Sequence, residues 1–155
     1  MKVRLFESED TEQIAQLFQN TVRKINIRDY SAAQIKAWSP DDLNWRNWRA
    51  LCGTRFTYVA TANQKILGFG ELEANGHIDC FYVHYRHQRQ GVGHSIYQAI
   101  EIKAQELSLN RIFTEASITA KTFFLKQGFK IISPQEVSCR GEVFTNYSMT
   151  KELYG

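Results

Sequence analysis

The chain has 155 residues, of which 43% are hydrophobic and 23% charged, which is typical of one globular domain with its own core. Its net charge of +3 is too small to indicate a nucleic-acid partner. It contains no apolar run long enough to cross a bilayer and no secretory signal at its start. The three widely spaced cysteines suggest reduced thiols rather than a disulfide framework. We therefore expect a cytoplasmic protein with a single domain over residues 1–155 and with neither a membrane nor a nucleic-acid partner.

The first part of the chain repeats a helix-start signal. Asp10 is followed three residues later by Gln13, and Ser31 by Gln34, which is the spacing of a capping box. Apolar residues at helical spacing follow both signals, and Ser39-Pro40 ends the second helix. The elements expected in this part are a strand at 3–6, a helix after each capping signal and a short helix at 42–51.

The rest of the chain alternates strands, turns and two more helices. Asn75-Gly76 is a strong hairpin signal, and Gly128 is placed to end a helix. Periodicity alone therefore predicts an α/β or α+β fold. The elements expected here are strands at 56–62, 66–73, 77–83 and 111–116, helices at 92–107 and 119–127, and a last hairpin of 137–139 and 143–150.

Gln88 to Gly93 form a glycine-rich loop between the strand at 77–83 and a long helix. The first N–H groups of a helix have no internal partner, so a loop of this kind can bind a phosphate. Gly91 and Gly93 lack side chains that would hold a phosphate off the backbone. The loop is not a Walker loop, because Gly93 is followed by His94-Ser95 and not by lysine and then serine or threonine. It is not a dinucleotide fingerprint, because Ile96 stands where that motif has its third glycine. The loop predicts a phosphate-bearing cofactor.

The loop Gln88-Arg89-Gln90-Gly91-Val92-Gly93 resembles the acetyl-CoA loop of the GNAT N-acetyltransferase superfamily, Arg/Gln-x-x-Gly-x-Gly/Ala. Downstream, residues 120–129 resemble the second signature of that family, Ala-x-x-x-Tyr-x-x-x-Gly-Phe. The resemblance covers the chain from about residue 56 to its end. It implies one acetyltransferase domain with a mixed α+β fold: a twisted mixed sheet of six to seven strands, with helices on both faces and a splay between strands 4 and 5.

The resemblance also implies acetyl-CoA as co-substrate, without a metal. Backbone N–H groups of the loop would hold the pyrophosphate, and the edge of the strand at 77–83 would hold the pantetheine arm by strand addition. Ser117 stands near a family asparagine that contacts the cofactor, although it could also cap the next helix. The implied cofactor residues are Phe81, Tyr82, Val83, Gln88, Arg89, Gln90, Gly91, Val92, Gly93, His94, Ser95, Ser117 and Phe124.

Direct transfer to an amine requires a base, because a lysine-like amine has a pKa of about 10. His77 and Asp79 are candidates that lie nominally on one face of the central strand, with Glu115 next. A bulge is common in this strand in the family, and it would shift the alternation of side chains along the strand by one residue. The alternatives are a turn role for His77 and a structural hydrogen bond for Asp79. Glu71, Glu73 and Glu115 are carboxylates on strands near the expected cleft, and most of them are expected to be ordinary solvated residues.

The second signature departs from the family at Phe124, where a tyrosine usually protonates the leaving thiolate. Tyr30, Tyr82, Tyr147 or water could replace it. By resemblance, the first two helices and the last hairpin enclose the acceptor. The expected substrate-binding residues are Tyr30, Trp38 and Tyr147.

These features predict an acetyl-CoA-dependent N-acetyltransferase acting on a small amine rather than a protein amine, as a monomer or homodimer. Phe124 also leaves open a non-catalytic CoA-binding module. A third reading places nucleic acid on Arg46, Arg49 and Arg55 beside nearby tryptophans, and it is the weakest because the net charge is low.

Overall fold

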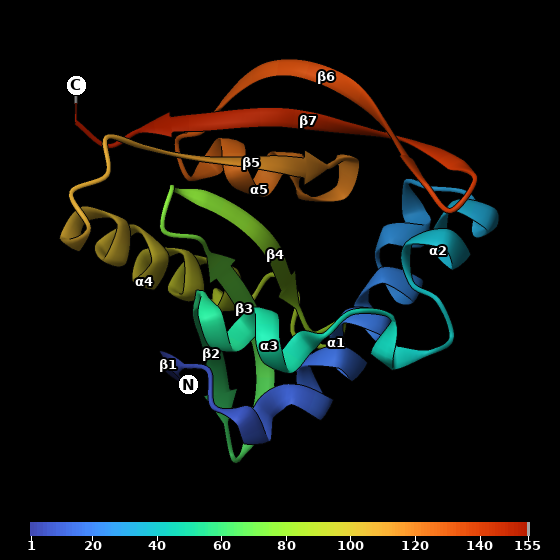
Figure 1. Cartoon of the computed structure of the whole chain (residues 1–155), viewed down its shortest axis with the longest axis horizontal. Coiled ribbons are helices and arrows are strands. Elements are labelled where there is room, and N and C mark those ends of the chain that lie inside the picture. The colour runs from blue at the N-terminus through green and yellow to red at the C-terminus, as the bar shows by residue number, and fades with distance from the viewer. Residues whose placement is uncertain (155) are drawn as a thin grey trace.

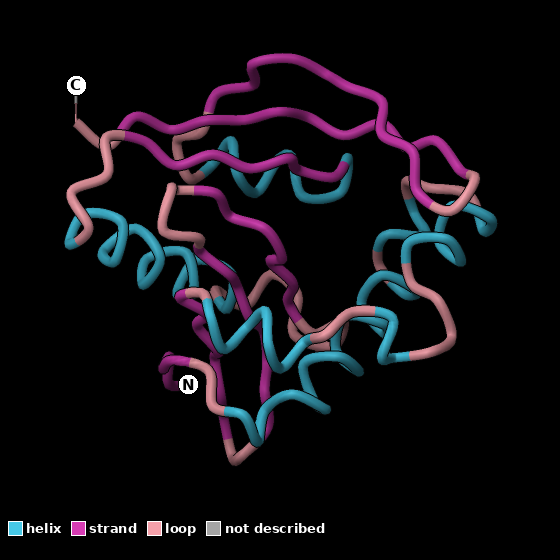
Figure 2. The backbone as a smooth tube through the Cα atoms, viewed as in Figure 1, coloured by secondary structure: helices cyan, strands magenta, loops and turns pink. Residues whose placement is uncertain are grey.

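The computed structural model describes residues 1–154, which form a seven-stranded mixed sheet with five α-helices (Figures 1 and 2). Short 3-10 turns occupy Ser8–Asp10, Asn26–Arg28 and Leu43–Trp45. The strands are β1 (Lys2–Leu5), β2 (Phe56–Ala62), β3 (Lys65–Leu72), β4 (His77–Val83), β5 (Arg111–Ser117), β6 (Lys130–Cys139) and β7 (Glu142–Glu152). The helices are α1 (Thr11–Lys24), α2 (Ala32–Trp38), α3 (Trp48–Thr54), α4 (Val92–Glu106) and α5 (Ile118–Lys126).

The sheet is split between β4 and β5. Its strand order is β1-β2-β3-β4-β5-β7-β6, and β4 and β5 form its parallel pair. These two strands pair only at His77 with Phe113 and at Ile78 with Thr114, and beyond that point they diverge (Figure 1). The splay between strands 4 and 5 is therefore confirmed, and it leaves one edge of β4 open to a ligand.

Helices cover both faces of the sheet, as expected. One apolar cluster packs Phe18 of α1, Ile35 of α2 and Trp48 of α3 on one face. The other packs Ile100 of α4 and Phe124 of α5 on the opposite face. No helix among residues 1–154 is both long and apolar enough to cross a membrane.

A bulge interrupts β4, as the family resemblance implied. Gly70 pairs with Phe81, but Leu72 pairs with Ile78, so two residue steps on β3 face three on β4. The extra residue of β4 lies opposite Glu71 and shifts the side-chain alternation of β4 by one. Cys80 consequently packs on the α1 side of the sheet, although Ile78 packs on the α4 side.

Three local predictions were wrong. Asp10 makes no capping bond to α1, because its carboxylate accepts hydrogen bonds from Arg4 at 2.8 and 2.9 Å. The helix expected at 42–51 is a 3-10 turn followed by α3, which begins only at Trp48. The last hairpin is longer than predicted, since β6 begins at Lys130 and continues through Pro134, which an edge strand tolerates. The capping box of Ser31 and Gln34 is confirmed.

Candidate active site

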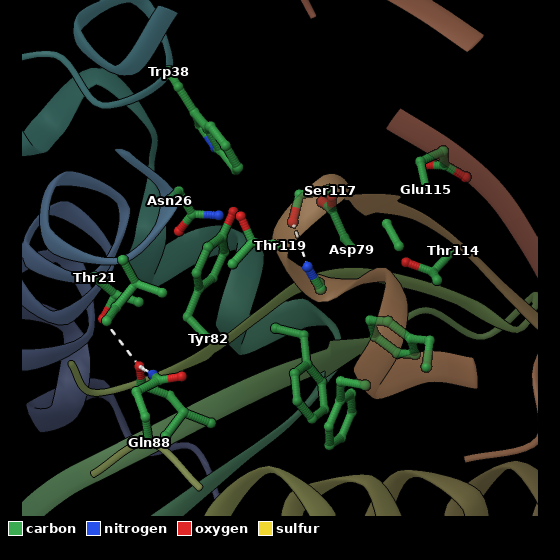
Figure 3. Close-up of a pocket in the computed structure, with 17 residues that line it drawn as sticks. Thr21, Asn26, Trp38, Asp79, Tyr82, Gln88, Thr114, Glu115, Ser117 and Thr119 are labelled. Carbon is green, nitrogen blue, oxygen red and sulfur yellow. Dashed lines mark hydrogen bonds between the residues drawn. The ribbon is translucent and has the colours of Figure 1, made fainter. Parts of the chain in front are cut away.

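A first cavity, of about 190 Å³, follows the open edge of β4 toward the glycine-rich loop (Figure 3). Gln88 fixes this edge, because its Nε2 donates to the Val83 carbonyl at 2.7 Å. The Thr21 hydroxyl donates to the same carbonyl at 3.1 Å. Both lone pairs of this carbonyl are thereby used, so Val83 can meet a cofactor only through its other atoms. The expected cofactor residues that line the cavity are Phe81, Tyr82, Val83, Gln88, Ser117 and Phe124.

A second cavity, of about 420 Å³, lies on the α1 side of the sheet and is walled largely by aromatic side chains. Tyr30, Trp38 and Phe144 contact one another there at ring-centroid distances of 5.3 to 6.0 Å. Five residues line both cavities and so mark the place where the two cavities meet. They are Trp38, Asp79, Tyr82, Glu115 and Ser117.

The glycine-rich loop has the backbone of an anion site. Arg89 has φ of +59° and Gly91 has φ of +83°, and such alternating left-handed residues turn N–H groups toward one point. Within residues 1–154, the N–H groups of residues 89–94 donate to no protein acceptor. A Cβ at Gly91 would meet no atom within 4 Å, so the space before the loop is open. This space and these free donors fit a pyrophosphate.

Two loop residues differ from their expected roles. The Ser95 N–H donates to the Gly91 carbonyl at 3.1 Å and is not free for a phosphate, because Ser95 already lies in the first turn of α4. A Cβ at Gly93 would lie 3.0 Å from a ring carbon of Phe123, so this glycine allows close packing of α4 on α5. The His94 ring contacts Gln127 at 3.0 Å.

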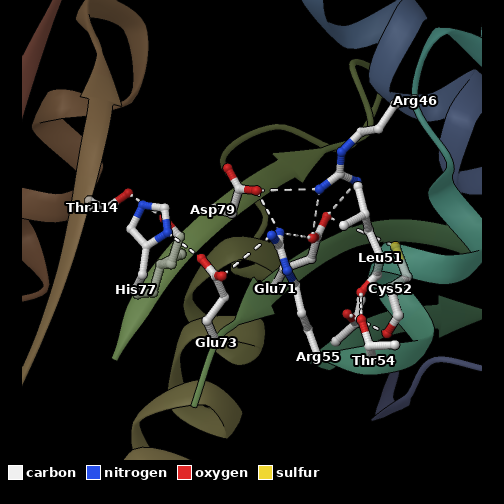
Figure 4. A network of polar contacts seen from close by, with 12 residues as sticks. Arg46, Leu51, Cys52, Thr54, Arg55, Glu71, Glu73, His77, Asp79 and Thr114 are labelled. Atoms are coloured by element: carbon white, nitrogen blue, oxygen red, sulfur yellow. Dashed lines mark hydrogen bonds and ion pairs between the residues drawn. The ribbon is translucent and has the colours of Figure 1, made fainter. Parts of the chain in front are cut away.

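A charge network crosses the bulge of β4 (Figure 4). Glu71 is fully buried, and Arg46 donates to its two oxygens at 2.8 and 3.0 Å. Arg55 donates to Glu71 at 2.8 Å and to Asp79 at 2.5 Å, and Arg46 reaches Asp79 at 3.3 Å. Burial is the largest single effect on Arg46 and lowers its pKa, but the hydrogen bond to Glu71 and the nearby negative charges together outweigh burial, so the pKa is raised. The expectation of a solvated Glu71 was wrong.

The same network changes the interpretation of Asp79 and of the arginines. Asp79 faces both cavities, but its carboxylate is already paired with Arg46 and Arg55, and accepting a proton would break both ion pairs. The structural alternative for Asp79 was a hydrogen bond to the neighbouring strand, but its partners are Arg46 and Arg55, which lie outside the strands. These two arginines are used inside the fold, which removes them from the nucleic-acid reading.

His77 contacts two carboxylates, one of which is Glu73 (Figure 4). Its Nδ1 contacts Glu73, and its Nε2 lies 2.8 Å from Glu115 Oε1. Burial lowers the pKa of His77, but the hydrogen bonds to Glu73 and Glu115 outweigh it and raise the pKa above its ordinary value. Glu115 lines both cavities and His77 lines neither, so His77 stands behind Glu115 and does not share a site with Asp79.

Only some of the expected hydroxyls and aromatic residues reach the meeting point. Phe124 is buried in the α4-side core and has no proton to donate. The Tyr30 hydroxyl donates to the Thr145 carbonyl at 2.7 Å and accepts from the N–H of the first residue of α5 at 2.9 Å, so it is occupied. Tyr147 lines neither cavity, because its ring packs 4.4 Å from the Lys121 ammonium. Tyr82 remains as the hydroxyl-bearing tyrosine at the meeting point.

Ser117 serves a structural role beside its place in the site. Its hydroxyl accepts from the Ala120 N–H at 3.0 Å and caps α5. Trp38 lies at the meeting point opposite the β4 edge, as expected for an acceptor residue (Figure 3).

Comparisons with known proteins agree with this geometry. Residues 26–151 match the model of the acetyltransferase (GNAT) domain family. The chain belongs to this family. The uncharacterized N-acetyltransferase YafP of Escherichia coli K12 is 31% identical over 150 residues, which cover 96% of this chain and 94% of YafP.

Solved structures show the same architecture. A GCN5-related N-acetyltransferase from Rhodopseudomonas palustris superimposes with a TM-score of 0.91 at 30% identity, covering 98% of this chain and 95% of that one. The PaiA N-acetyltransferase of Thermoplasma acidophilum, solved with coenzyme A, has a TM-score of 0.79 at 15% identity, covering 97% and 98%. The predicted fold and family are confirmed, and this chain is an N-acetyltransferase of the GNAT family.

Proposed function

We propose that this N-acetyltransferase transfers the acetyl group of acetyl-CoA directly to the amine of a small molecule. The acetyl-bearing end of the pantetheine arm would occupy the first cavity, the pyrophosphate would lie outside it on the N–H groups of residues 89–94, and the acceptor would occupy the second cavity. The meeting of the two cavities carries the proposal, because a thioester carried along β4 would face an amine there. The free cysteines fit the reducing cytoplasm.

Glu115 is the proposed proton acceptor. It faces both cavities and its side chain is 41% exposed, so an amine or a bridging water can reach it. Asp79 is held by Arg46 and Arg55, and its carboxylate is the proposed fixed hydrogen-bond acceptor for the amine at the meeting point. His77 is the proposed positioning residue, because its Nε2 fixes the carboxylate of Glu115.

Tyr82 is the proposed hydrogen-bond donor to the leaving thiolate. Burial raises the pKa of its hydroxyl well above the ordinary value, so the phenol stays protonated. A protonated phenol at the meeting point can stabilise the negative charge that grows on sulfur as the carbon–sulfur bond breaks.

The proposal is tested by isothermal titration with acetyl-CoA and then by CoA release with a panel of small primary amines. We expect saturable binding and acetyl-CoA-dependent release of CoA with at least one amine. Release with a lysine-containing peptide but with no small amine would contradict the small-molecule acceptor. Absence of acetyl-CoA binding at millimolar ligand would contradict the cofactor site.

A further inference from the structure

Asn146 has an unused carboxamide in the wall of the second cavity. It lies in the middle of β7, paired with Ser117 of β5 and with Gln135 of β6, so its backbone is fixed on both sides. Its side chain lines the cavity, and its Oδ1 is buried without a hydrogen-bond partner among residues 1–154. Its Nδ2 donates to no protein group in the same part of the chain. A buried carbonyl oxygen without a partner is costly and uncommon, and here no protein hydrogen bond from the described residues fixes the carboxamide in its orientation. A ligand in the cavity can supply the missing bond once the carboxamide turns toward it.

The sheet register places this carboxamide at a definite distance from the proposed proton acceptor. Glu115 pairs with Ser148, and Ser117 pairs with Asn146, so Asn146 lies two residues further along the sheet than Glu115. Two residues of a strand span about 7 Å. A ligand whose amine is at Glu115 would therefore reach Asn146 with an atom about 7 Å away along the strand direction.

Aromatic side chains line the cavity beside these two positions. Phe144 lies two residues before Asn146 on β7, on the side away from Glu115, and it contacts Tyr30 and Trp38 in the cavity wall. Aromatic walls favour a planar ligand, which stacks on them or meets them edge to face. The cavity volume of about 420 Å³ lies within the range for small-molecule sites.

We propose that Asn146 is a specificity-determining residue that hydrogen-bonds the acceptor. The acceptor is a primary amine with a planar apolar body and a hydroxyl or N–H group about 7 Å from its amine nitrogen. Rotation of the Asn146 carboxamide turns either its oxygen or its nitrogen to the cavity, so it can accept from such a group. This inference rests on the proposed function, because it names the substrate class of the same site.

The test compares 2-(4-hydroxyphenyl)ethylamine with 2-phenylethylamine, which differ only in a hydroxyl at the far end from the amine. We expect kcat/KM to favour the hydroxylated amine by about tenfold in the wild type. In Asn146→Leu this ratio should fall to about one, because no group remains to receive the hydroxyl. The apo variant should also keep or raise its Tm, since it loses an unsatisfied oxygen.

Ser39→Ala is the matched control. Ser39 also has a buried side-chain oxygen without a partner among residues 1–154, but it is fully buried and lines neither cavity. Ser39→Ala should keep its Tm and the tenfold preference, and Asn146→Ala serves as a second variant if Asn146→Leu does not fold. A wild-type ratio near one, or a preference that survives both Asn146 variants, would overturn the inference while leaving the acetyltransferase intact. Failure of every amine to release CoA would instead overturn the proposed function.

Discussion

His77 Nε2 lies 2.8 Å from Glu115 Oε1, and this contact joins β4 to β5 at the place where their pairing ends. One residue further, at Ile78, the strands make their last pair and begin to diverge. The contact therefore fixes a cleft-facing carboxylate to the rigid part of the sheet. Glu73 holds the other nitrogen of His77, so the imidazole cannot turn away from Glu115.

His77 should make stability depend on pH. Its folded pKa is raised above the unfolded value of about 6.5, so its contribution is fully present below that value and is lost as pH rises through the folded pKa. The Tm difference between wild type and His77→Gln should be largest near pH 6 and should decrease toward pH 9. Thermal unfolding of both proteins across this range checks the prediction, and a constant difference would contradict it.

Gly91→Asp should weaken acetyl-CoA binding by about a hundredfold or more, because the added carboxylate would face the pyrophosphate and its donors. Gly141→Asp is the matched control. Gly141 has the same φ of +83° and an equally open Cβ position, but it lies in the β6–β7 turn. Isothermal titration should show loss of affinity only in the first variant. Equal affinities would mean that the loop is only a turn.

Glu71→Gln should destabilise the fold by about 3–5 kcal/mol, because it leaves the charges of Arg46 and Arg55 poorly compensated at a buried site. Asp41→Asn is the control. It removes an ion pair with Arg23 at a carboxylate that is 84% exposed, so it should change stability by less than about 1 kcal/mol. Urea unfolding measures both, and similar small effects would show that the buried network is not structural.

Tyr82→Phe should lower kcat by about tenfold or more, with the acetyl-CoA dissociation constant nearly unchanged, because it removes a donor needed only as charge develops on sulfur. Tyr147→Phe should keep the wild-type kcat, since Tyr147 lines neither cavity. Steady-state kinetics and titration separate the two effects. An unchanged kcat in Tyr82→Phe would assign thiolate stabilisation to water.

Local signals predicted the parts of the fold that depend on local chemistry. The capping box at Ser31, the turn glycine Gly128 and the loop at 88–93 all lie where expected. The prediction of an Asp10 cap failed because an ion pair with Arg4 of β1 uses its carboxylate, and capping-box spacing does not include that partner. The prediction placed the start of β6 too late, because Pro134 indicates a break in a strand unless that strand is known to lie at an edge of the sheet.

The residues of the candidate site were likewise predicted only where a local motif marks them. Motif residues were predicted, but Arg46, Arg55 and Glu71 were missed, because their partners are distant in sequence. A signal was present for Glu71, since a carboxylate flanked by the apolar run of β3 needs a cationic partner. Asn146 had no sequence signal, because its role follows only from an unmade hydrogen bond in a cavity.

The most direct test of the account is the pH dependence of turnover in Glu115→Gln, with Glu136→Gln of the exposed β6 strand as control. At saturating acetyl-CoA, the account predicts a loss of kcat of about a hundredfold near pH 7 for Glu115→Gln. This loss should shrink toward pH 9.5, where more of the amine is already neutral, while acetyl-CoA affinity and the rate of Glu136→Gln stay near wild type. Wild-type rates in Glu115→Gln across the whole pH range would contradict it.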